Sequence, residues 1–299
     1  MRSTSTASTS SHRRVHLKAM PWLAISLGAL GLCALTLILW RVSDTRTDRA
    51  IWNELLFAAG AAGPEFKLGV IEGLPEPAQR FFRYAIAEGT PLVSVVEIEM
   101  NGQLGLGTKN DPNYRDMTAR QILAPPRGLV WKMSAGAVGG SDAATPSTSW
   151  TRFWLLKLIP IARVSGSSDH HRSAFGRIVA EGAFWVPSSL LPSNDVSWES
   201  VDANTARAIV SFGRYSQAVD LTVEEDGQPS RVIIQRWSNE NADRVFREQP
   251  FGGYLSDFRE FAGYRLPMRV EGGNLIGTDD YFPFYKAQVR TIRFPQLEQ

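Results

Sequence analysis

The feature that most constrains this chain is a long apolar run near its N-terminus. No charged residue occurs between Lys18 and Arg41, and Trp22 and Trp40 stand near the two ends of the run. At about 1.5 Å per residue, a helix over Ala19–Trp40 would measure roughly 33 Å, enough to cross the apolar core of a bilayer. Tryptophans are typical of the membrane interfaces. The run therefore predicts one transmembrane helix, with the membrane as a partner.

Basic residues on either side of the run predict its orientation. Four precede it and three follow it: Arg2, Arg13, Arg14 and Lys18, then Arg41, Arg46 and Arg49. Because the positive-inside rule counts basic residues only, we expect the N-terminus in the cytoplasm. The C-terminal part would then be extracytoplasmic, at the inner membrane of a bacterium. Residues 1–18, rich in Ser and Thr, are expected to form a disordered cytoplasmic tail.

Three other interpretations of the run are weaker. A cleavable signal peptide would have a shorter apolar region and an A-x-A site after it. A lipoprotein anchor at Cys33 would need a small residue before the cysteine, where Leu32 stands, and apolar residues follow it. A buried helix of a soluble protein is rarely so long and so apolar. An uncleaved span is the preferred interpretation.

Composition bounds what the rest of the chain can be. With 43% hydrophobic residues and a formal net charge of +2, it is not a disordered chain, and it lacks the basic excess of a nucleic-acid-binding protein. A single cysteine excludes a disulfide framework and a cysteine-based zinc site. No linker or repeat interrupts residues 73–294. We therefore expect a helical linker at 41–72 and one extracytoplasmic domain at 73–299.

The spacing of apolar residues predicts a few helices and many strands. Residues 51–62 form a helix leading out of the membrane, residues 78–86 have one apolar helical face, and residues 173–191 form a helix ending near Pro187. Asp226-Gly227 and Gly272-Gly273-Asn274 are expected to be turns. Period-two alternation predicts strands at 93–106, 115–123, 128–134, 206–212, 218–224, 230–237, 264–271 and 286–294.

Succession of strands without alternating helices predicts an antiparallel sheet. Such a sheet needs helices to cover its apolar face. We assign this role to the helix at 173–191 and to the strongly apolar segment 150–161, and we expect a long loop rich in Gly, Ser and Ala at 136–149. The expected fold class is α+β, an antiparallel sheet packed on helices and preceded by one transmembrane helix.

Several stretches resemble a bacterial family of uncharacterised, membrane-anchored proteins with a domain of unknown function. They are Gly73–Tyr84, Arg177–Pro192, Asp257–Arg259, Gly263–Pro267 and Phe282–Tyr285. The resemblance covers residues 73–294 and implies no established activity. The family's architecture is similar to the half-barrel of the LolA/LolB lipoprotein carriers, in which a curled antiparallel sheet encloses an apolar cavity. The resemblance thus implies a curled sheet, and fold alone does not give function.

Glu181 is the charged residue with the clearest chemical interest, because it lies among apolar residues of the expected helix. A buried carboxylate needs a partner or a raised pKa, and such a group can act as a general acid or base. An ion pair with Arg177, one helical turn earlier, is the simpler interpretation. Catalysis by Glu181 is therefore the alternative, and the chain is more readily interpreted as a protein that is not an enzyme.

The sequence predicts neither a metal site nor a cofactor. Asp169, His170 and His171 are adjacent and cannot share one helical face, so a polar loop is preferred there. Asp279-Asp280 lacks the further oxygen ligands that calcium needs.

Apolar side chains in 150–161 and 184–191 exceed what a small sheet face would bury. Core packing accounts for part of them, and an apolar cavity with a few polar groups would account for the rest. We expect ligand contacts from Trp154, Leu158, Arg177, Glu181 and Trp185. The leading hypothesis is a membrane-tethered binding module for a lipid or another apolar ligand. An envelope hydrolase using Glu181 and a structural or assembly component of the envelope are the alternatives.

Overall fold

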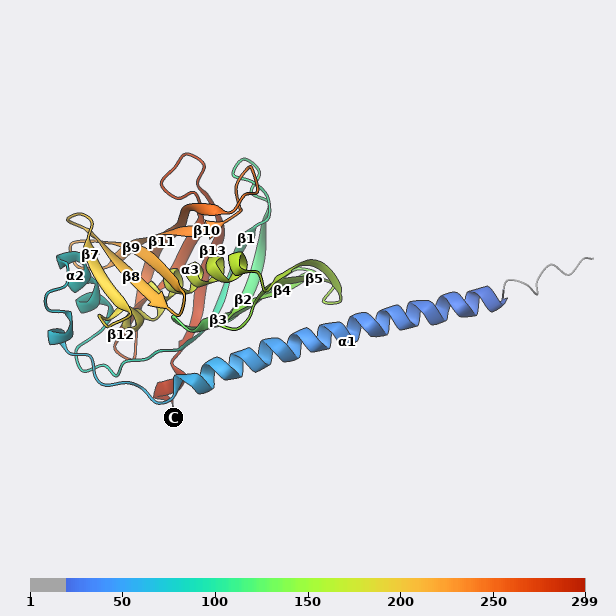
Figure 1. The fold of residues 1–299 in the computed structure, drawn as a ribbon, viewed down its shortest axis with the longest axis horizontal. Helices are drawn as coiled ribbons and strands as arrows, with labels where there is room; N and C mark the ends of the chain where they lie inside the picture. The colour runs from blue at the N-terminus through green and yellow to red at the C-terminus, as the bar shows by residue number, and fades with distance from the viewer. Residues whose placement is uncertain (1–19, 299) are drawn as a thin grey trace, which may run out of the picture. The chain divides into compact units, whose positions relative to one another are not determined.

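The computed structural model describes residues 20–298 (Figure 1), so the expected tail at 1–18 lies outside the described residues. The chain divides into two compact units, 1–44 and 45–299. The second unit, called the domain below, begins inside the expected linker 41–72.

The N-terminal helix α1 (Met20–Ala59) runs without a break for 40 residues. The helix expected at 51–62 is therefore the last part of a longer one, and it ends before Gly60, whose φ of +60° leaves the helical region. Between Trp22 and Ala59, α1 is long and apolar enough to cross a membrane, and its most apolar stretch is not buried against protein. These properties are shared by membrane anchors and signal sequences.

The domain contains one unclosed sheet of thirteen strands, in the order β6-β5-β4-β3-β2-β1-β13-β12-β11-β10-β9-β8-β7. All neighbours pair antiparallel. The strands are β1 (Val96–Gly105), β2 (Tyr114–Ala124), β3 (Gly128–Ala135), β4 (Val138–Ala144), β5 (Ser149–Leu155), β6 (Ile159–Ser165), β7 (Val196–Ser200), β8 (Thr205–Phe212), β9 (Tyr215–Val223), β10 (Pro229–Ser238), β11 (Arg247–Phe261), β12 (Tyr264–Asn274) and β13 (Phe282–Arg293). The expectation of a curled antiparallel sheet is confirmed.

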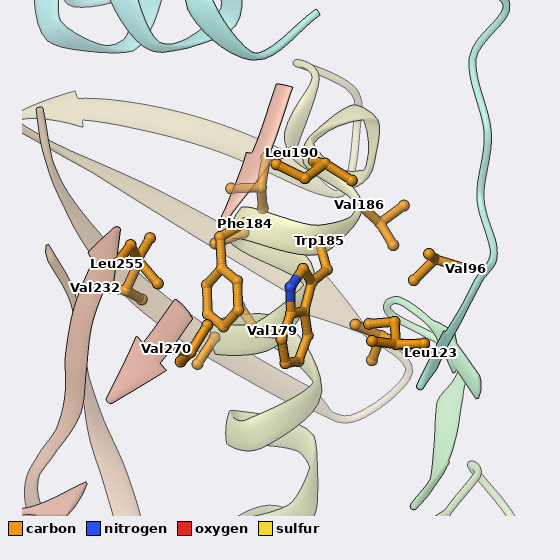
Figure 2. Packing of buried hydrophobic residues seen from close by; sticks show 14 of the residues in the cluster. Val96, Leu123, Val179, Phe184, Trp185, Val186, Leu190, Val232, Leu255 and Val270 are labelled. Atoms are coloured by element: carbon orange, nitrogen blue, oxygen red, sulfur yellow. The ribbon is translucent and has the colours of Figure 1, made fainter. Parts of the chain in front are cut away.

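Helix α3 (Ser168–Trp185) connects the two edges of the sheet and lies within its curl. It packs against β2–β5 on one side and against β9, β10 and β12 on the other. Figure 2 shows its C-terminal end, where Phe184 and Trp185 lie between Val232 and Leu255 on one side and Leu123 on the other. A 3₁₀ turn, η2 (Pro187–Leu190), follows near the predicted helix end. The apolar side of α3 is thus the centre of the core.

The helix expected at 78–86 is confirmed as α2 (Glu76–Ala85), which follows the 3₁₀ turn η1 (Leu68–Ile71). Its predicted apolar face is buried, with Phe81 and Phe82 almost fully inaccessible. This face covers β7, β8, β9 and β12. A last 3₁₀ turn, η3 (Pro295–Leu297), ends the described chain.

The part of α1 that belongs to the domain packs on the other face of the sheet, over β2–β5. Ile51 and Leu55 form a second apolar cluster with residues of β2–β5, among them Ile122. Its neighbour Leu123 belongs to the main core around α3, as the alternation of side chains along a strand requires. Trp52 also donates a hydrogen bond from its indole Nε1 to Glu97 Oε1 (2.7 Å). Residues 45–59 are therefore an integral part of the domain.

Three sequence predictions are wrong in this part of the chain. The segment 150–161 is not a helix but belongs to the β5–β6 hairpin, the loop at 136–149 contains β4, and the turn at 272–274 lies within β12. Strands β7 and β11 were not predicted. β4 escapes detection because its glycines and alanines have low strand propensity. Its glycines fit the position instead, since the ring of Phe153 packs directly over Gly140.

Two neighbouring glycines of β4 provide a matched test of this packing. A methyl group at Gly140 would press into the ring of Phe153 and lie 3.0 Å from the Arg152 carbonyl oxygen, whereas at Gly139 its nearest neighbour would be 3.7 Å away. We expect Gly140→Ala to destabilise the domain by about 1–2 kcal/mol through overpacking, and Gly139→Ala to cost clearly less. Urea unfolding of the two variants measures the difference. Equal midpoints would contradict the packing described.

Candidate functional site

A network of charged side chains lies between α3 and the concave side of the sheet. Arg177 donates from Nε to Glu181 Oε1 (2.6 Å) and from Nη1 to Asp142 Oδ2 on β4 (3.0 Å). The first two residues share a face because they are one helical turn apart. The three side chains are only 15%, 16% and 23% exposed. One partly buried cation therefore bridges two carboxylates, as expected for Arg177 and Glu181 but not for Asp142.

A buried amide and an indole complete this network. Gln121 on β2 is fully buried, and its Nε2 donates to the second carboxylate oxygen of Glu181. The guanidinium of Arg177 lies over the ring of Trp131 at 5.3 Å. Both oxygens of Glu181 thus accept hydrogen bonds, which is the arrangement of a structural ion pair. Catalysis by Glu181 stays a prediction.

Two buried acceptors in the network have no hydrogen-bond partner among residues 20–298. They are Gln121 Oε1 and Asp142 Oδ1. A buried acceptor without a partner costs about 1–3 kcal/mol, and most such atoms in folded proteins are satisfied by protein or ordered water. Each of the two atoms is therefore a position where a donor group of a water or of a ligand fits.

The surrounding charges set the protonation of the network. Burial by itself lowers the pKa of Arg177, but the carboxylates of Glu181 and Asp142 outweigh this effect and raise it above its usual value. Burial, and then repulsion by Arg177, lower the pKa of Arg236 to about 10. Burial and the charge of Glu181 raise the pKa of Tyr285. At neutral pH both arginines are therefore charged and the phenol is protonated.

Arg236 and Tyr285 extend the network towards β10 and β13. Arg236 donates from Nε to Ser173 Oγ (3.1 Å), and its guanidinium lies 4.6 Å over the ring of Phe251. The Tyr285 hydroxyl donates to Met100 Sδ (2.7 Å). Sequence reasoning missed Gln121, Asp142, Arg236 and Tyr285, because strand pairing across the whole chain brings them to α3 and no local pattern marks them.

The other predicted ligand contacts lie elsewhere. Trp185 is fully buried at the end of α3, where its Nε1 donates to the Pro267 carbonyl oxygen (3.4 Å). Trp154 is fully buried on β5, and Leu158 is half-buried in the β5–β6 turn. The structure thus joins Arg177 and Glu181, and the ligand contacts of the two hairpin residues stay predictions.

The residues Asp169, His170 and His171 form the first turn of α3, not the polar loop expected. Ser167 caps this turn by accepting a hydrogen bond from the backbone N–H of His170 (3.1 Å). The imidazole of His170 contacts Ser149 Oγ (2.8 Å) and Thr151 Oγ1 (3.1 Å) on β5. Within the described residues, no group of three or more His, Cys, Asp or Glu side chains could hold a metal ion.

His170 gives the domain a pH dependence of stability. Burial lowers the pKa of His170 below its usual value of 6.5. As pH falls, the imidazole of the unfolded chain is therefore protonated at a higher pH than that of the folded chain. The contribution of neutral His170 to the free energy of unfolding is complete above about pH 6.5 and is lost as pH falls through the lowered pKa. We expect the melting temperature to fall less between pH 7 and pH 5 in His170→Gln than in the wild type. Identical slopes would contradict this assignment.

Comparison with known proteins identifies the family of this chain and no activity. Residues 64–287 match the family model described as "Family of unknown function (DUF6544)". A search of curated proteins finds no match. Two solved structures are similar over 91% of their own length. A LolA superfamily protein from Nitrosomonas europaea is 10% identical over 73% of this chain, with a TM-score of 0.40. A putative outer membrane lipoprotein-sorting protein domain from Vibrio parahaemolyticus is 11% identical over 76%, with a TM-score of 0.36. The expected resemblance to an uncharacterised family is confirmed.

Proposed function

The chain belongs to DUF6544, a family of unknown function, and we propose that it is a membrane-tethered module that binds a lipid or another apolar ligand. The observation that carries this proposal is the polar network inside the curled sheet. Its two buried acceptors, Gln121 Oε1 and Asp142 Oδ1, have no partner in the described chain. Neither atom is needed for the ion pair, so both are available to a ligand.

The surroundings of these acceptors are those of a site for a largely apolar molecule. The guanidinium of Arg177 lies over the ring of Trp131. The ring of Tyr285 is edge-on to the ring of Trp131, with 6.3 Å between the ring centroids. Met100 and Met133 belong to the same apolar cluster. Ligand sites in proteins are mostly apolar, with a few polar groups that fix orientation. The ligand that fits has an apolar body and a polar group that donates hydrogen bonds.

The apolar part of α1 supports the tether. Its leucines and isoleucines are exposed among the described residues, and a bilayer would remove them from water. The excess of basic residues before the span favours a cytoplasmic N-terminus. The domain would then stand at the outer face of the cytoplasmic membrane.

Labelling of single cysteines tests the tether and its orientation in the full-length protein. In a Cys33→Ser background, Glu225→Cys in the β9–β10 turn should react with a membrane-impermeant maleimide added to intact spheroplasts, and Ser10→Cys should react only after lysis. The protein should also stay in the membrane pellet after carbonate washing. The reverse labelling pattern, or release by carbonate, would overturn this part of the proposal.

Lipid extraction tests the ligand part separately. Full-length protein purified in mild detergent should carry a lipid at a fixed stoichiometry. The matched control is residues 1–44 fused to an unrelated soluble domain, which retains the span and lacks the binding module. A lipid present equally in both preparations belongs to the span and would count against binding by the domain.

A further inference from the structure

The β5–β6 hairpin carries apolar side chains that are exposed among the described residues. β6 is an edge strand of the sheet. The exposed fractions along the hairpin are 37% for Leu155, 67% for Leu156, 44% for Ile159, 53% for Ile161 and 53% for Val164. A contiguous exposed apolar patch marks an interaction site, whereas single exposed residues need no explanation.

The charges of the hairpin favour an anionic surface. Lys157 is exposed in its turn and Arg163 is half-buried on β6. No acidic residue occurs between Asp142 and Asp169. Each basic residue close to an anionic membrane contributes about 1 kcal/mol to the free energy of binding. Apolar side chains combined with basic ones are the composition of protein surfaces that bind at the lipid interface.

The edge strand is poorly suited to pairing with another chain. Pro160 lies near the start of β6 and has no N–H to donate, and Arg163 follows it on the same strand. Proline and charged residues are the usual means by which proteins protect an exposed edge from a second strand. A second copy of this chain is therefore a poorer occupant of this surface than a membrane.

The position of the hairpin in the domain supports the same conclusion. Leu55 lies beside Gly128, which adjoins Ala144 at one end of β4. Asp48 precedes Leu55 on α1 by about two helical turns, and it accepts a hydrogen bond from Ser141 Oγ (3.0 Å). Ser141 lies three residues before Ala144 on β4, and so closer to Val138. Val138 pairs with Leu155 beside the hairpin turn. Residues 45–59 thus run along β4, and their N-terminal end lies towards the β5–β6 hairpin.

We propose that the β5–β6 hairpin is a second membrane contact, whose tip at Leu155–Ile159 enters the interface of an anionic bilayer. The proposal rests on the tethering part of the proposed function. The hairpin would hold the domain in one orientation on the lipid surface.

Fluorescence quenching in vesicles tests this contact in the full-length protein. In the Cys33→Ser background, Leu156→Cys carries an environment-sensitive dye, and Glu225→Cys in the β9–β10 turn is the matched control. The protein is reconstituted in vesicles of equal parts phosphatidylcholine and phosphatidylglycerol, with and without brominated acyl chains. We expect a blue-shifted emission at position 156 that brominated lipids quench, and an unquenched emission at position 225.

A charge variant tests the lipid specificity of the contact. Lys157→Gln should reduce the equilibrium ratio of inserted to free hairpin about fivefold, the factor that corresponds to one basic residue at an anionic surface. Replacing phosphatidylglycerol by phosphatidylcholine should have an effect in the same direction. An unquenched dye at position 156 in protein that floats with the vesicles would overturn the hairpin contact alone. A disulfide-linked dimer through Cys at position 156 would assign the surface to a second copy, and protein that fails to float would overturn the tether as well.

Discussion

Replacing Arg177 with alanine is expected to lower the free energy of unfolding of the domain by about 3–5 kcal/mol. Arg177 contacts both Glu181 and Asp142, and all three side chains are mostly buried. Without the cation, two carboxylates would face each other in a setting from which water is largely removed. Breaking a buried pair by removing one partner is far more costly than the pair itself is stabilising. Urea unfolding of the wild type and the variant measures the loss.

The same helix offers a matched control for this prediction. Arg172 also forms an ion pair, with Glu248 (2.5 Å), but the two side chains are 44% and 54% exposed. Exposed pairs contribute about 0–1 kcal/mol, so Arg172→Ala should have a small effect. The double variant Arg177→Met with Glu181→Gln should recover part of the loss, because it removes charge of both signs. Equal losses of unfolding free energy in Arg172→Ala and Arg177→Ala would contradict the assignment of the large effect to burial of the network.

The second large effect is expected at Trp185. Its side chain is fully buried and packs edge-on against Phe184, with 4.7 Å between ring centroids. Figure 2 shows both rings in the middle of the core, between strands from opposite sides of the curled sheet. Trp185→Ala would remove the largest side chain at this contact, and such truncations cost about 3–5 kcal/mol because the core does not fully collapse into the space. The melting temperature and the urea midpoint should both fall.

An exposed apolar residue is the control for Trp185. Val201, which is 46% exposed, should tolerate alanine within about 0.5 kcal/mol. The sequence also predicted Trp185 as a ligand contact, and the stability measurement separates the two roles. A Trp185→Ala protein with wild-type stability would contradict its place as a core residue.

Local sequence patterns predicted the elements whose formation depends on residues close together in the sequence. α2 follows from the i, i+3, i+4 spacing of Ala78, Phe81 and Phe82, and the β9–β10 turn follows from Asp226-Gly227. β4 and the β5–β6 hairpin were missed for two different reasons. Glycine and alanine in β4 have low strand propensity, and the long apolar segment 150–161 does not alternate in the way of a half-buried strand. Only pairing with neighbouring strands establishes both elements.

The candidate site shows the same division between local and long-range information. Arg177 and Glu181 are one helical turn apart in the sequence, so their spacing was enough to predict the ion pair. Asp142 lies on the strand that was expected to be a loop, and Gln121 reaches Glu181 from 60 residues away. The depth of a polar residue in a curled sheet depends on the pairing order of all the strands. No sequence pattern close to Gln121 carries that order.

Native mass spectrometry of the full-length protein released from nanodiscs tests the central claim of ligand binding most directly. The wild type should retain one lipid-sized molecule at energies that strip annular lipid. Gln121→Met removes the unpartnered acceptor, together with the Nε2 donor to Glu181, at nearly constant volume and should lose that molecule. Gln103→Met, at an exposed glutamine of β1, should retain it. A wild-type spectrum with no retained molecule, or equal retention in Gln121→Met, would contradict a ligand held by the network on α3.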